Sequence, residues 1–108
     1  MLTISEEVSV VIVGNYTQSQ TYSTTSGILI KKNACVVIQG DCTVHNFSTF
    51  SNSGTVDVAG NLTISSHVSF ENFGEIFVKG DVAIDKWVSG DFIINGSSPQ
   101  TIYGNFYN

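Results

Sequence analysis

The stretch VDVAGNLTI, residues 56–64, has two close relatives in the same chain. VVIQGDCTV, residues 36–44, stands twenty residues earlier, and IFVKGDVAI, residues 76–84, stands twenty residues later. Self-similarity at a fixed period of about 20 to 50 residues is the sequence signature of repeat architectures, in which each repeat contacts its neighbours. The three phrases therefore indicate three stacked repeats in the middle of the chain.

Aligning the phrases places similar residues in columns at even-numbered positions. These columns are Ile38/Val58/Val78, Gly40/Gly60/Gly80, Cys42/Leu62/Val82 and Val44/Ile64/Ile84. The odd positions between them are mostly polar, as in Gln39, Asp41 and Thr43. Alternation with a period of two is typical of a strand with one buried face, whereas a helix would need a period of 3.6.

A coil of about 20 residues cannot bury its own inward face, but a second coil stacked about 4.8 Å away in parallel can. We therefore predict an all-β fold, a parallel β-solenoid of four to five coils of about 20 residues, with residues 1–108 forming one domain. Gly14 of the phrase GNYT stands further from Gly40 than Gly40 stands from Gly60. The first full coil should therefore be longer, with a loop around residues 17–27.

Smaller features of the repeat predict local structure. The recurring phrase should form one wall of each coil, and its shared glycine should mark a bend where a side chain would clash or a special φ is needed. Asn52 falls above Asn72 and Phe50 above Phe70 at the same interval. The asparagines predict a short amide ladder at a turn.

Charge and hydropathy exclude several classes of partner. Four lysines, no arginine and nine carboxylates give a net charge of −5, which repels phosphate backbones and anionic membranes. No apolar run is long enough to cross a bilayer, so neither nucleic acid nor membrane insertion is expected. The first residues lack a secretory signal, so the chain is either cytosolic or an excerpt of a longer exported chain.

The two cysteines, Cys35 and Cys42, are seven residues apart. An extended chain between them would span roughly 23 Å, far beyond the separation of about 6 Å that a disulfide allows. We expect two unpaired thiols, with Cys42 packed as a small hydrophobic residue.

The phrases VIVGNYTQS at residues 11–19, VDVAGNLTI and the ending FIINGSSPQTI at residues 92–102 resemble the repeats of bacterial surface and secreted proteins of the large exoprotein or adhesin type. The resemblance covers nearly the whole chain, from Leu2 to Ile102. It implies a right-handed parallel β-helix displayed outside the cell as a stalk, adhesin or wall-associated scaffold. The Asn-Pro-Asn-Gly signature of haemagglutinin-type secretion domains is missing, so their export route is not implied.

Two groups of outward residues are candidate ligand-binding sites. Asp41, Asn61 and Asp81 form one column, and clustered oxygen atoms of this kind suit Ca²⁺ or a sugar-processing site. Against this interpretation, Asn61 dilutes the charge and no arginine is available, and a solvated ladder that limits aggregation is the alternative. Trp87 and Tyr22 are the aromatic candidates for stacking on sugar rings, with Phe73 and Phe77 near the first; burial in the core is the alternative.

No ordered nucleophile, base and acid appears, and His45 and His67 fall in different columns. We therefore predict a non-enzymatic structural or adhesive segment of a bacterial surface or secreted protein, extracellular or at the cell surface, without a cofactor or metal. The alternative is a carbohydrate-binding module or a remnant of a polysaccharide-active β-helix. The expected partners are a glycan or a cell-wall or host surface, together with end-to-end self-association through open strand edges.

Overall fold

A computed structural model describes residues 2–19, 27–45, 48–64, 68–84, 89–93, 100–102 and 106–107, and all regular elements in them are β-strands. The first sheet contains β1 (Leu2–Ile4), β4 (Gly27–Ile30), β7 (Thr49–Asn52), β10 (Ser69–Asn72) and β13 (Ser89–Ile93). The second contains β2 (Ser9–Ile12), β5 (Cys35–Ile38), β8 (Thr55–Val58), β11 (Glu75–Val78) and β14 (Gln100–Ile102). The third contains β3 (Tyr16–Gln18), β6 (Cys42–Val44), β9 (Leu62–Ile64), β12 (Val82–Ile84) and β15 (Phe106–Tyr107).

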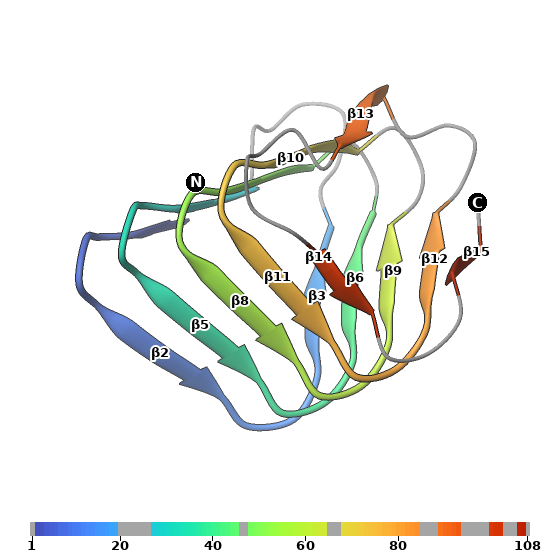
Figure 1. The fold of residues 1–108 in the computed structure, drawn as a ribbon, viewed down its shortest axis with the longest axis horizontal. Helices are drawn as coiled ribbons and strands as arrows, with labels where there is room; N and C mark the ends of the chain where they lie inside the picture. Colours follow the sequence, from blue (N-terminus) through green and yellow to red (C-terminus); the bar gives the residue numbers. More distant parts are fainter. Residues whose placement is uncertain are drawn as a thin grey trace.

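Every third strand along the chain is a neighbour in the same sheet, and every pairing is parallel. Three successive strands, one from each sheet, form what we call a coil. Figure 1 shows the second-sheet strands lying side by side and turning, one after another, into the strands of the third sheet. The predicted all-β, parallel, solenoid-like fold is thus confirmed. No helix in the described part of the chain is long and apolar enough to span a membrane.

The spacing between paired positions changes along the stack. Asn15 and Asp41, which are hydrogen-bonded between the first two coils, are 26 residues apart in the chain. In the middle of the stack, Asn52 and Asn72 are 20 residues apart, and β5 pairs with β8 at the same interval. The interval lengthens again at the end, where Ile76 pairs with Gln100. The predicted length of the central coils and the longer first coil are confirmed.

The prediction that the recurring phrase forms one wall is wrong. Residues 56–64 contribute the end of β8 and all of β9, which belong to two different sheets and are separated by a corner at residues 59–61. Burial nevertheless alternates through that corner, because Val58 and Leu62 are both buried while Ala59 and Asn61 are exposed. A three-residue corner preserves the period of two, so the hydrophobic pattern carries no sign of the change of sheet.

The glycine of the phrase occupies this corner, which we call the second corner. A Cβ at Gly60 would overlap the Asp41 side chain and lie 2.8 Å from the Gly40 carbonyl oxygen, and Gly80 is similarly crowded by Asn61 and Gly60. In the first coil, Gly14 has open space around it but a φ of +99°. The predicted bend is confirmed, and both expected reasons for glycine occur, at different coils.

The corner between the first and second sheets, the first corner, closes in two ways. In the first two coils it has four residues, and the Val8 and Ala34 N–H groups donate to the Ser5 and Lys31 carbonyls at 3.2 and 3.1 Å. Glu7 and Asn33 have a positive φ there. In the third and fourth coils, two residues suffice, and a buried side chain replaces the backbone acceptor. The Asn52 and Asn72 Oδ1 atoms accept the Gly54 and Gly74 N–H groups at 3.0 and 3.2 Å.

The same asparagines form the predicted ladder. Asn52 Nδ2 donates to Asn72 Oδ1 at 2.9 Å, and also to the Gly54 and Glu75 carbonyls at 3.3 and 3.1 Å. Asn72 Nδ2 has no partner among the described residues. Two positions earlier on the same strands, the Phe50 and Phe70 rings stack with centroids 4.8 Å apart and planes 7° from parallel. Like residues therefore stack on like, as the twenty-residue columns predict.

The remaining core consists of the inward side chains of all three sheets. Both cysteines are free, and Cys42 is fully buried between neighbouring coils, as expected. Burial raises the pKa of the Cys42 thiol to about 12. The pKa of Tyr16 also rises to about 12, first because of burial and second because of the nearby Cys42. Both groups therefore stay protonated at neutral pH.

Candidate functional site

The predicted column of Asp41, Asn61 and Asp81 lies along the second corner and begins one coil earlier with Asn15. Each of the first three side chains accepts a hydrogen bond from the backbone of the next coil. Asn15 Oδ1 accepts the Asp41 N–H at 2.8 Å, Asp41 Oδ1 accepts the Asn61 N–H at 2.9 Å, and Asn61 Oδ1 accepts the Asp81 N–H at 2.8 Å. The structure thus brings the three residues together, with one oxygen atom of Asp41 and one of Asn61 engaged in joining coils.

This geometry separates a structural role of the column from a ligand-binding role. Asp41→Asn keeps the Oδ1 acceptor, so we expect the free energy of unfolding to change by less than about 0.5 kcal/mol. Asp41→Ala removes the acceptor of the Asn61 N–H and should cost about 1 kcal/mol. Urea unfolding followed by circular dichroism measures both. A calcium-dependent gain in stability that Asp41→Asn abolishes would contradict a purely structural column.

Trp87 and Tyr22 lie outside the described residues, and so does His67. Within the described ranges, no group of three or more His, Cys, Asp or Glu side chains is placed to hold a metal ion. Ligand binding by Asp41, Asn61, Asp81, Trp87 and Tyr22 therefore stays a prediction.

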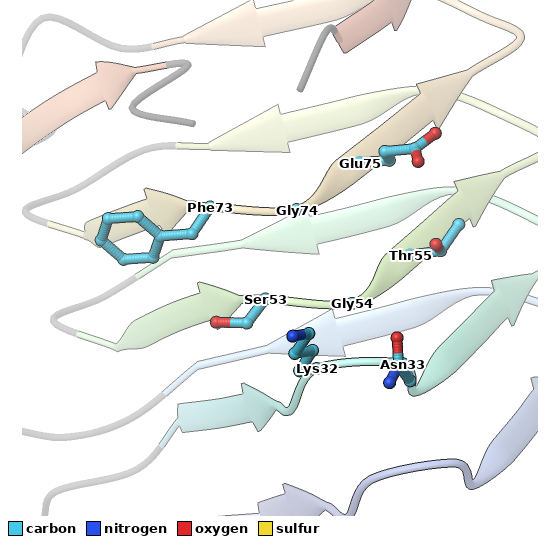
Figure 2. Close-up of a pocket in the computed structure, with 8 residues that line it drawn as sticks. All are labelled: Lys32, Asn33, Ser53, Gly54, Thr55, Phe73, Gly74 and Glu75. Atoms are coloured by element: carbon cyan, nitrogen blue, oxygen red, sulfur yellow. The ribbon is translucent and has the colours of Figure 1, made fainter. Parts of the chain in front are cut away.

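An open cavity of about 200 Å³ lies along the first corner, on the second, third and fourth coils. We call it the corner groove. It is lined by Lys32, Asn33, Ser53, Gly54, Thr55, Phe73, Gly74 and Glu75. Figure 2 shows the side chains of Ser53 and Phe73 directed to one side of the two glycines, and those of Thr55 and Glu75 to the other. We call the two glycines the floor of the groove and the two pairs of side chains, which point away from each other, its banks.

The groove exists because neighbouring coils close the first corner differently. The second coil uses four residues there, 31–34, and the next two coils use two residues each. Lys32 and Asn33 are exposed on the longer corner and end the groove on that side. Its floor must lack side chains, because a Cβ at Gly54 would overlap the Ala34 carbonyl oxygen and one at Gly74 the Gly54 carbonyl oxygen.

Hydrogen bonds to Asn52 hold the backbone of the groove in place. Asn52 contacts the Gly54 N–H, the Gly54 carbonyl and the Glu75 carbonyl through its buried side chain. The Phe73 and Gly74 N–H groups donate to the Asn52 carbonyl at 2.7 and 3.1 Å. The backbone of the groove is therefore fixed before any ligand arrives, which lowers the entropic cost of binding.

Phe73 is the most distinctive side chain of the groove. It is 51% exposed, next to a buried asparagine and a buried glycine. The sequence placed Phe73 near the aromatic candidates but offered no reason to join it to Lys32 or Glu75. An alignment of Ile30 with Asn52 and of Cys35 with Thr55 would have shown the two extra residues of the longer corner, and that step was the available signal.

The outer side of the first coil is a second unusual surface. Leu2 is 53% exposed although its partner in the next coil, Ile28, is 2% exposed. Val10 and Ile12 are half-buried, whereas their partners Val36 and Ile38 are fully buried. The strands β1, β2 and β3 each stand at the end of their sheet. Inward-facing apolar side chains and unpaired strand edges therefore meet at one end of the described stack.

The likeness to bacterial exoproteins and adhesins rests on the quoted phrases, and it stays a prediction. The parallel stacking of every third strand supports a β-solenoid architecture. It does not indicate which protein family the chain comes from. Scans of protein-family models, of curated proteins and of solved structures find no match to this chain.

Proposed function

We propose that this chain is a non-enzymatic segment of a right-handed parallel β-helix in a bacterial surface or secreted protein, located outside the cell. Its role is structural or adhesive: it extends a rod by stacking coil upon coil. The observation that supports this role is the open face of the first coil, where Leu2, Val10 and Ile12 are exposed or half-buried although the equivalent positions of the next coil are buried.

Another coil matches this face better than any unrelated surface. The edges of three parallel strands must be paired at once, at a spacing of about 4.8 Å, around an apolar centre. A coil with the same cross-section supplies both the backbone partners and the apolar cover. We therefore expect purified protein to associate end to end as its concentration rises, because stacking covers apolar side chains and pairs open strand edges at the same time.

Blocking a single edge N–H tests this association. The Val8 and Ile12 carbonyls accept hydrogen bonds from Cys35 and Gln39 of the second coil. Successive residues of a strand direct their N–H and C=O groups to opposite edges, so the even-numbered residues of β2 face the second coil and the N–H of Val11 points to the open edge. Val11→Pro removes that donor at a position where an edge strand tolerates proline. We expect light scattering to show wild-type mass rising with concentration, and the variant to need at least about tenfold more protein for the same mass.

Val11→Thr is the matched control, because it keeps the N–H and the β-branched shape. It should associate like the wild type. A wild-type protein that stays monomeric at all concentrations would contradict end-to-end stacking, and so would a proline variant that associates as well as the wild type.

The corner groove favours the second candidate function, a carbohydrate-binding module or the remnant of a polysaccharide-active β-helix. Its exposed aromatic ring and flanking polar groups are features of a saccharide site rather than of a scaffold wall. The two functions are compatible, because the groove lies on a lateral corner and leaves the end of the stack free.

A further inference from the structure

We propose that the corner groove binds a neutral saccharide, with Phe73 as the stacking platform. This inference goes beyond the structural role proposed above and does not depend on end-to-end association. It also places the glycan site on the first corner, and not on the column of Asp41, Asn61 and Asp81 along the second corner.

The side chain of Phe73 is about half exposed to solvent. Burying a phenylalanine side chain is favourable, yet Phe73 is 51% exposed, whereas Phe50 and Phe70 are buried. Its backbone is held by the bond from the Phe73 N–H to the Asn52 carbonyl, so the ring is presented from a fixed corner. A sugar ring offers an apolar face of C–H groups that can cover such a ring, while its edge remains polar.

The opposite bank provides the polar contacts that a sugar edge requires. Glu75 is exposed and Thr55 is half-exposed there, and both lie across the two glycines from Phe73 in Figure 2. A carboxylate accepts hydrogen bonds from hydroxyl groups, and a threonine hydroxyl both donates and accepts. At the end of the groove, Lys32 and Asn33 add donors and an amide acceptor. A chain of sugar rings, each with an apolar face and several hydroxyl groups, offers partners to both banks.

Charge decides between classes of saccharide. Within the groove, the positive charge of Lys32 is balanced by the negative charge of Glu75, so no excess charge remains to hold an anion. The whole chain carries a net charge of −5, which repels polyanions. A neutral oligosaccharide is therefore favoured over a uronic-acid or sulfated polymer.

An extended peptide is the competing occupant, and the backbone argues against it. Peptides that add to a sheet need unpaired N–H and C=O groups. The Ser53, Thr55, Phe73, Gly74 and Glu75 N–H groups along the groove already donate to the neighbouring coil. The groove therefore offers side chains to its ligand, and saccharides are recognised mainly through side chains of this kind.

The experiment is titration calorimetry of the intact chain with hexasaccharides of glucose, mannose and xylose, with polygalacturonate as the anionic probe. We expect at least one neutral hexasaccharide to bind, and Phe73→Ala to weaken that binding at least about tenfold. Phe73→Trp should retain it, because the larger ring preserves the stacking face. Phe77→Ala is the matched control, since this half-exposed aromatic residue of β11 lies outside the groove, and it should bind like the wild type.

Because Phe73 projects from a corner, its replacement should leave the circular dichroism spectrum and the unfolding midpoint nearly unchanged, so lost binding reports the site. No binding of any neutral hexasaccharide at millimolar concentration would overturn the proposal. Binding that Phe73→Ala leaves intact, or a preference for polygalacturonate, would overturn it as well. Any of these results leaves the association test with Val11→Pro unaffected, so the two proposals fail separately.

Discussion

Leu62→Asp is expected to unfold the middle coils of the solenoid. Leu62 is 2% exposed and lies in the third sheet between Cys42 and Val82, both buried. A carboxylate there would lose its water without gaining a partner, which costs at least about 4 kcal/mol. A domain of this size is stable by only about 5–15 kcal/mol, so a large fraction of that stability would be lost. Urea unfolding followed by circular dichroism measures the loss.

The next residue provides the control. Thr63 is half-exposed, pairs with Thr43 and Ala83, and points away from the core. Thr63→Asp should cost about 1 kcal/mol or less, chiefly through the lower strand propensity of aspartate. Equal sensitivity of the two positions would contradict the inward and outward alternation on which the fold depends.

Asn52→Leu should produce the second large effect. Ile30 occupies the equivalent position in the neighbouring coil, so an apolar side chain of similar size fits this column. What the variant loses is the set of hydrogen bonds from Asn52 to Gly54, Asn72 and Glu75, and the Gly54 N–H is left without its acceptor. Each buried bond contributes about 1 kcal/mol and an unsatisfied buried group costs about 1–3 kcal/mol, so we expect a loss of about 3–5 kcal/mol.

Two further variants make this result specific. Ser51→Ala, at the half-exposed neighbouring position, should change the free energy of unfolding by less than about 0.5 kcal/mol. Combining Asn52→Ala with Asn72→Ala should cost less than the sum of the single variants by about 1 kcal/mol, because the two side chains share one hydrogen bond. A stability of Asn52→Leu equal to that of the wild type would show that the ladder is dispensable.

The ladder also has a consequence for the proposed binding site. Asn52 holds the Gly54 and Glu75 carbonyls beneath the corner groove, so Asn52→Leu should also loosen the groove floor. A variant that stays folded at low temperature would then bind saccharide more weakly although Phe73 is present. Asn72 and Phe73 are adjacent in the chain, but the Asn72 side chain is buried inside the corner and the Phe73 side chain is exposed outside it.

The repeat pattern predicts the columns of the stack better than it predicts the corners. Stacked coils force residue i to lie over its counterpart one coil on, so the columns through Phe50 and Phe70, and through Asn52 and Asn72, were predictable from spacing alone. The positions of the corners were less predictable than these columns. A three-residue corner at residues 59–61 and a two-residue corner at residues 53–54 both leave the run of buried positions consistent with strands, so a change of sheet leaves the hydrophobic pattern intact.

The sequence by itself determined the parallel stacking, the length of the central coils, the longer first coil and the identity of the buried columns, because burial with a period of two and a register of twenty residues are properties of the chain order. Only the tertiary structure decided how many sheets the coil forms, which backbone atoms Asp41 and Asn61 engage, and that Lys32, Phe73 and Glu75 share a groove. These features depend on contacts between corners on neighbouring coils; the spacing of the columns reveals the two extra residues of the longer corner, but not which side chains meet there.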